Sequence, residues 1–146
     1  MFFLEELPTH RMIERYVEET GSGNTERIGD ALAMLRKASM LVRKLDAYFQ
    51  KHGLSQLRFL VLIVIDREPD RHSLRQSEIL ERLDVSKPVL HRTVAAMIAA
   101  GHLERVDDPH DARAHQLSIA TDARNLLQEI LPGYFELITQ FMENQT

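Results

Sequence analysis

The side chains with the clearest chemical potential lie in one stretch, KPVLHRTVAAMIA, at positions 87–99. At helical spacing, the apolar Leu90 and Val94 fall on one side of this stretch and leave basic and small side chains on the other. A guanidinium such as that of Arg92 can donate two hydrogen bonds to O6 and N7 of guanine, and alanine methyl groups can contact thymine. The pattern therefore predicts a helix that reads the major groove of duplex DNA. The alternative is a surface helix whose alanines reflect helix propensity alone.

Contacts to the DNA backbone are expected at the start of this helix. Ser86, Lys87 and the exposed N–H groups of a helix N-terminus suit phosphate oxygens. Arg113 follows at the end of a polar turn, from which it is expected to enter a neighbouring minor groove. The predicted DNA-binding residues are Arg75, Ser86, Lys87, Pro88, His91, Arg92, Ala95, Asp111 and Arg113.

Two short helices are needed to position these residues. Residues Ser73 to Gln76 match the S-x-x-Q capping box, which predicts that a short helix begins there. Ser86 is expected to cap the second helix, with Pro88 in its first turn, and Gly101 is expected to end it. A tight turn at 84–85 joins the two, so the pattern is a helix-turn-helix.

After this pair of helices the apolar period changes to two. His102–Val106 and His115–Ile119 are predicted to be strands, and the polar segment Asp107–Arg113 between them is predicted to be a turn. A helix-turn-helix followed by a β-hairpin is a winged helix, so the fold class is mainly α with a two-stranded wing. Residues 54–120 form this part.

Long helices are expected on both sides. Apolar steps of three and four predict a helix over Thr25–His52 and another over Thr121–Met142, with a kink or break at Pro132-Gly133. Phe59–Ile65 suits a buried helix or a strand, and the preceding Gly53-Leu54-Ser55 favours the helix. The apolar faces of the long helices exceed what one winged helix could cover, which predicts a homodimer rather than a monomer with folded-back ends.

Composition excludes several classes of protein. The chain has 146 residues, 18 Lys+Arg against 22 Asp+Glu, and no Cys, so disulfides and thiolate metal sites are excluded. It has no glycine-rich phosphate loop, G-x-S-x-G or H-E-x-x-H motif, so we expect no enzymatic activity and no cofactor. The longest uncharged apolar run, Phe59–Ile65, is too short to span a membrane, and no secretory signal precedes it. These features predict a cytoplasmic protein.

Histidines gather in the predicted DNA-binding region at positions 72, 91, 102, 110 and 115. Their protonation would add positive charge there, so a pH-sensitive DNA affinity is one hypothesis, and solvated surface histidines are the simpler alternative. A metal site built from Asp108, His110, Asp111 and His115 is a weaker hypothesis, because hairpin spacing does not bring these groups together, and no metal site is predicted.

Two segments, DVSKPVLHRTVAAMIAAGHLERV and DPHDARAHQLSIATDARNLL, resemble the MarR family of winged-helix repressors. The resemblance implies one MarR-type domain over residues 1–146, with dimerisation helices in 1–52 and 121–146. It also implies a homodimer that binds a palindromic operator in double-stranded DNA, represses transcription and is released by a small aromatic or phenolic ligand. In such proteins an Asp at position 111 holds Arg113 through an ion pair. The alternative function is a winged-helix protein-interaction module that has lost DNA binding.

The wing departs from the family pattern, because Ala112 stands where members usually carry a second basic residue. Fewer phosphate contacts predict weaker and more salt-sensitive binding. Family ligands tend to lie between the dimerisation helices and the reading head. The corresponding residues predicted to bind a ligand are Leu41, Leu45, Tyr48, Phe49 and Phe59.

Overall fold

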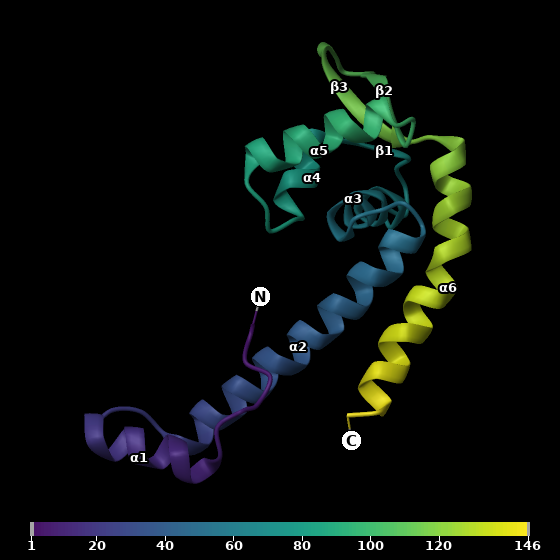
Figure 1. Ribbon diagram of the computed structural model, residues 1–146. Coiled ribbons are helices and arrows are strands. Elements are labelled where there is room, and N and C mark those ends of the chain that lie inside the picture. Colours follow the sequence, from purple (N-terminus) through teal and green to yellow (C-terminus); the bar gives the residue numbers. More distant parts are fainter. Residues whose placement is uncertain (1, 146) are drawn as a thin grey trace. The chain divides into compact units, whose positions relative to one another are not determined.

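The computed structural model describes residues 2–145, apart from the side chain of Ala112. The chain divides into two compact units, residues 1–47 and 48–146, whose elements are labelled in Figure 1. Helix α2 (Thr25–Lys51) begins in the first unit and ends in the second.

The first unit contains α1 (His10–Thr20) and most of α2. Thr9 caps α1 by accepting a hydrogen bond from the backbone of Met12, and Gly21 ends the helix in the left-handed conformation. A side chain of α2 binds the backbone of the segment before α1: the guanidinium of Arg36 donates to the carbonyl of Leu4 at 2.9 Å.

The second unit is built around α3 (Gln56–Asp66), which confirms the helix predicted for the apolar run. Ser55 caps this helix by accepting a hydrogen bond from the backbone of Arg58 at 3.2 Å. The helix lies in the centre of the unit and buries side chains around most of its circumference: Phe59, Val61, Leu62, Val64 and Ile65. It is the platform on which the helix-turn-helix packs.

The helix-turn-helix consists of α4 (Gln76–Glu81) and α5 (Lys87–Ala99). Ser86 caps α5 as predicted, and Pro88 occupies its first turn. The start predicted for α4 is wrong by two residues, because Ser73–Arg75 form a strand, β1, and Arg75 rather than Ser73 is the N-cap of the helix. One half of a capping box is instead found further along the chain, where the carboxylate of Glu78 accepts a hydrogen bond from the N–H of Arg75 at 3.0 Å.

The wing belongs to a three-stranded antiparallel sheet in the order β1-β3-β2, with one strand more than the predicted hairpin. Strands β2 (Leu103–Asp108) and β3 (Asp111–Ile119) extend to within two residues of each other. The predicted seven-residue turn at 107–113 is therefore wrong, and the turn is Pro109-His110. The residues around Asp107–Arg113 favour a turn locally, but pairing between the strands extends beyond what local propensity predicts. It continues to Asp108 opposite Asp111, with a register shift between Asp107 and Asp108.

Helix α6 (Thr121–Glu143) ends the chain and runs without a break through Pro132. Of the kink or break predicted at Pro132-Gly133, the break is thus wrong. Proline removes one backbone donor, and the hydroxyl of Tyr48 donates to the nearby carbonyl of Ile130 at 2.7 Å.

Residues 2–145 include no helix that is both long and apolar enough to cross a membrane. The mainly helical fold with a small antiparallel wing confirms the predicted winged helix-turn-helix class.

Candidate nucleic-acid interface

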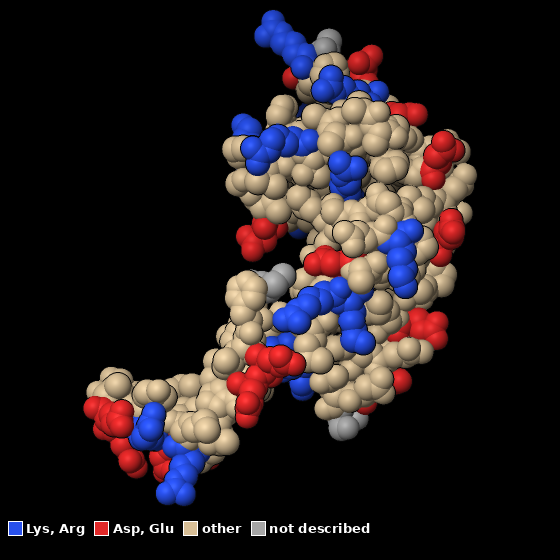
Figure 2. All heavy atoms as spheres, in the orientation of Figure 1, with Lys and Arg blue, Asp and Glu red and all other residues tan. Residues whose placement is uncertain are grey.

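Helix α5 presents one face to solvent, and this face carries most of the predicted DNA-binding residues. Lys87, Pro88, His91, Arg92 and Ala95 are all exposed, and Ser86 at the cap is exposed as well. Figure 2 shows Lys and Arg side chains spread over the region of α5 and the wing, in the upper part of the view. The face combines positive charge with small side chains that would allow the backbone to approach a groove closely.

The opposite face of α5 fixes the helix to the domain. Leu90 and Met97 are 0% exposed, and Val94 is 3% exposed. The hydroxyl of Thr93 donates back to the carbonyl of Val89 at 2.9 Å, so it is occupied within the helix. The separation of the two faces is the one that sequence periodicity predicted.

A contact between the two helices lies at this surface. The side-chain amide nitrogen of Gln76, the first residue of α4, is 3.4 Å from Nδ1 of His91. Both side chains belong to the helix-turn-helix, so His91 is oriented partly by α4 rather than by α5 alone. Sequence reasoning missed Gln76, because its position suggested only a capping role.

Arg113 lies exposed on β3, close to the turn of the wing. Its backbone N–H donates a hydrogen bond to the carboxylate of Asp111 at 2.9 Å. This differs from the side-chain ion pair that the family resemblance implied. Asp111 therefore shapes the backbone at the start of β3.

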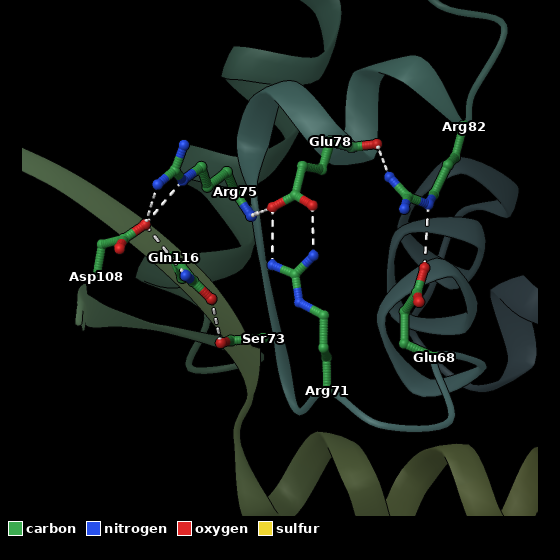
Figure 3. A network of polar contacts seen from close by, with 8 residues as sticks. All are labelled: Glu68, Arg71, Ser73, Arg75, Glu78, Arg82, Asp108 and Gln116. Carbon is green, nitrogen blue, oxygen red and sulfur yellow. Dashed lines mark hydrogen bonds and ion pairs between the residues drawn. The ribbon is translucent and has the colours of Figure 1, made fainter. Parts of the chain in front are cut away.

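The buried acidic residue of the wing is Asp108, whose side chain is 0% exposed. One carboxylate oxygen accepts hydrogen bonds from Nε of Arg75 at 2.7 Å and from the amide of Gln116 at 3.1 Å. The other oxygen accepts from the backbone N–H of His110 at 2.8 Å. Gln116 also contacts Ser73, so the network joins β1, β3 and the wing turn (Figure 3).

Hydrogen bonds stabilise the charged form of this carboxylate. The N–H of His110, the amide of Gln116 and the guanidinium of Arg75 together hold the pKa of Asp108 far below its usual range. We call Asp108, Arg75, Gln116 and Ser73 the Asp108 cluster. Sequence reasoning placed Arg75 among the DNA-binding residues, and the structure shows that its guanidinium is directed to Asp108.

A second polar group holds the start of α4. The guanidinium of Arg71 binds the carboxylate of Glu78, with one hydrogen bond of 2.8 Å, and this pairing lowers the pKa of Glu78 to about 2. Arg82 binds Glu68 at 3.1 Å, which connects the end of α4 to the loop after α3 (Figure 3). Neither Arg71 nor Arg82 was singled out from the sequence, because their partners lie outside any local motif.

The Asp108 cluster and the Arg71–Glu78 pair border an open groove of about 680 Å³ beside the wing. His72 and His110 also line it. Within the described part of the chain, no three His, Asp or Glu residues are arranged to hold a metal ion. Four of the charged side chains that border the groove are paired with one another, Arg71 with Glu78 and Arg75 with Asp108.

The residues predicted to bind a ligand are found in both units. In the first unit Leu41 is half-buried and Leu45 is buried. In the second unit Phe49 and Phe59 are each 1% exposed, with ring centroids 4.5 Å apart. Tyr134, which the sequence did not single out, packs against Phe59 at 4.7 Å. Both phenylalanines therefore contribute to the core of the second unit.

Tyr48 is half-buried and is held by its hydroxyl. Burial raises the pKa of this phenol, and the nearby carboxylate of Glu129 raises it further. The phenol lies against Gly133, where an added Cβ atom would be 2.4 Å from the hydroxyl oxygen. Gly133 thus permits the close approach of Tyr48 to α6.

Known proteins share this architecture. A sequence model of the MarR family matches residues 52–114. The HTH-type transcriptional repressor YetL of Bacillus subtilis (strain 168) is 24% identical over 141 residues, which cover 97% of this chain and 84% of YetL.

Two solved structures show the same fold. Sco3205, a MarR family transcriptional regulator from Streptomyces coelicolor in complex with DNA, is 21% identical with a TM-score of 0.77, covering 86% of this chain and 78% of that one. BpsR of Bordetella bronchiseptica, whose DNA binding is regulated by 6-hydroxynicotinic acid, is 17% identical with a TM-score of 0.67, covering 82% of each chain. The match over residues 52–114 makes this part of the chain similar to the MarR family, and the winged helix is the fold of MarR family transcriptional regulators of known structure.

Proposed function

We propose that this protein binds a palindromic operator in double-stranded DNA as a homodimer and represses transcription. The observation that carries the proposal is the exposed face of α5, on which Lys87, His91, Arg92 and Ala95 are accessible beside a wing that exposes Arg113. Arg92 would donate to guanine in the major groove, and Arg113 would enter the adjacent minor groove. Ser86, Lys87 and Pro88 at the start of α5 would lie against phosphate. Asp111 would shape the wing backbone at Arg113.

Dimerisation is proposed through residues 1–52 and 121–146. In the first unit, Phe3 is 83% exposed and Met34 is 66% exposed, and in the second unit Phe135 is 58% exposed. Large exposed apolar side chains on long helices suit burial against a second copy. A two-fold dimer would present two α5 helices to successive major grooves, which explains why the proposed operator is palindromic.

Repression and its release by a ligand are parts of the same proposal. YetL is a repressor, and 6-hydroxynicotinic acid regulates DNA binding by BpsR. We propose a small aromatic or phenolic effector that binds near Leu41, Leu45, Tyr48, Phe49 and Phe59. We also propose that the protein acts in the cytoplasm, where an operator and such a metabolite would both be accessible.

The experiment is a selection from random duplex DNA at moderate salt, with the wild type beside an Arg92→Ala, Arg113→Ala double variant. A matched control is the Lys51→Ala, Arg67→Ala double variant, which removes the same charge from exposed residues outside α5 and the wing. We expect an enriched inverted repeat with the wild type and the control, and its loss with the first variant. The same repeat from all three proteins would overturn the assignment of Arg92 and Arg113.

The exposed carboxylates of Asp107 and Asp111 on the wing favour one rival, a module that binds proteins rather than DNA. In that case a folded, dimeric wild type would enrich no sequence at any salt concentration. Addition of hydroxylated aromatic acids tests the effector separately. A ligand that binds the folded state raises the midpoint of thermal unfolding, and it should also reduce operator binding.

A further inference from the structure

Asp108 is an acidic residue in a position where negative charge would oppose DNA binding. It ends β2, next to the wing turn, and its side chain is fully buried, whereas the side chain of the preceding Asp107 is 96% exposed. A buried carboxylate is costly unless it is paired and hydrogen-bonded. The four hydrogen bonds and ion-pair contacts of Asp108 meet that requirement, so the residue has a structural task that a simple count of wing charges does not reveal.

The partners of Asp108 come from three separate places. Arg75 lies at the end of β1 and start of α4, Gln116 is on the central strand β3, and His110 is in the wing turn. Strand β1 pairs with β3 over only three positions, the last of which joins Arg75 to Gln116. Beyond that point, β2 and β3 project without β1. The side chain of Asp108 thus connects the end of β2 to Arg75 and Gln116, the last pair between β1 and β3 (Figure 3).

Arg113 lies on the projecting part of β3, three residues before Gln116. The orientation of the projecting strands therefore determines the position of the Arg113 side chain. We propose that Asp108, held by Arg75, is a positioning residue that fixes the wing so that Arg113 reaches the minor groove. This inference rests on the proposed DNA-binding function. It assigns to Arg75 a role through Asp108 rather than a direct contact with phosphate.

Electrostatics alone predicts the opposite outcome for a substitution. Removing a negative charge from the wing would strengthen attraction to DNA, and it would also release the guanidinium of Arg75 toward phosphate. Asp108→Asn removes the charge at constant shape. An asparagine amide has one acceptor oxygen and one NH₂ donor, so in either orientation a donor faces a donor: the Arg75 guanidinium and Gln116 amide, or the His110 N–H. The cluster would therefore be broken.

The test measures operator binding of the full chain by fluorescence anisotropy, using the DNA selected with the wild type. Asp107→Asn is the matched control, because it removes the same charge from the neighbouring exposed residue. We expect Asp108→Asn to bind about tenfold more weakly and Asp107→Asn to bind as tightly as the wild type or more tightly. Equal affinities of the two variants would overturn the inference.

A double-mutant cycle separates positioning from general stability. If Asp108 positions the wing, Arg113→Ala should weaken binding clearly in the wild type and less than twofold in the Asp108→Asn background. If Asp108 only stabilises the fold, the two losses should multiply, which would overturn the inference. Amide exchange in the free protein adds a readout without DNA: wing amides, including that of His110, should exchange faster in Asp108→Asn than in Asp107→Asn.

If Asp108→Asn does not fold, Arg75→Gln replaces it, since the carboxylate then keeps its bonds to Gln116 and His110. In the Arg75→Gln background, too, Arg113→Ala should weaken operator binding less than twofold. A loss independent of Arg113, with a salt slope lower by about 1, would show that Arg75 binds phosphate directly and would overturn the inference. A folded wild-type dimer that selects no DNA would overturn the proposed function itself, and the role of Asp108 in DNA binding with it.

Discussion

The hydroxyl of Tyr48 donates a 2.7 Å hydrogen bond to the main-chain carbonyl of Ile130, two residues before the proline of α6. The end of α2 is thereby attached to α6 within the second unit. The approach is possible because the next residue after the proline is Gly133, which leaves room for the phenol.

Gly133→Ala should therefore destabilise the protein, although alanine is ordinarily the better helix former. The new Cβ atom would lie 2.4 Å from the Tyr48 hydroxyl and 3.1 Å from the ring carbon that bears it, so the phenol must move. We expect a loss of about 1–3 kcal/mol in the free energy of unfolding, measured with urea. In a Tyr48→Phe background the penalty should be smaller. Stabilisation of the wild type by this alanine would contradict the packing described.

Glu78→Gln should make the stability less dependent on acid pH. The folded-state pKa of Glu78 is lowered to about 2, chiefly by its hydrogen bonds with Arg71. Because a lowered pKa favours the folded state above the unfolded-state pKa, this stabilisation is present at neutral pH and is lost as the pH falls from about 4.5 toward 2. The variant should lose about 2 kcal/mol at pH 7.

Urea titrations at a series of pH values check this expectation. The stabilities of the wild type and Glu78→Gln should converge toward pH 2. The exposed Glu81, also on α4, is a suitable control. The unfolding free energy of Glu81→Gln should differ little from that of the wild type at every pH. A constant difference between the wild type and Glu78→Gln would argue against the charged pair as its cause.

Leu90→Ala and His91→Ala should have opposite effects on stability and DNA binding. Leu90 is 0% exposed beneath α5, so its truncation should cost about 2–5 kcal/mol in unfolding free energy. His91 is exposed on the other face, and its truncation should cost about 0.5 kcal/mol or less while it alters the preferred operator sequence. Urea unfolding and repeated selection measure the two quantities. Equal destabilisation by both variants would mean that α5 is rotated from the orientation described.

Lys87→Ala and Arg92→Ala should weaken DNA binding in different ways. Lys87 lies exposed at the start of α5, so its loss should weaken binding to all sequences and reduce the salt slope by about 1. Arg92 lies farther along the exposed face, and its loss should cost about 1–3 kcal/mol at one base pair of the site. Titrations against the selected operator and single-base variants, at several salt concentrations, distinguish the two roles. Identical effects on all sequences would leave Arg92 without a reading role.

The sequence alone was sufficient to predict α5 in detail, because every determinant of this helix is local. Ser86, Pro88 and the apolar positions Leu90 and Val94 lie within a few residues of one another, and their spacing fixes both the start of the helix and its buried face. The change of the apolar period to two after Gly101 then predicted the wing. These features were enough to assign the fold and to name the exposed residues.

Features that depend on distant pairing escaped prediction. The side chains of Arg75 and Asp108 are 33 residues apart in sequence, and they meet only because a three-residue strand pairs with β3. Local signals at both places indicated something else, a helix cap at Ser73–Gln76 and a turn at 107–113. Pro132 was misleading because proline disfavours a helix interior locally, whereas α6 continues through it.

The order β1-β3-β2 leaves β2 as an outer strand of the sheet, and the outer edge of a β-sheet is a ready template for pairing with another chain. Here that edge carries the exposed charges of Glu104, Arg105 and Asp107, and an irregular register interrupts it at Asp108. Such charges and bulges discourage strand addition by a neighbouring molecule. The exposed edge of the wing is therefore a poor template for a strand of another molecule, even though it lies at the outside of the sheet.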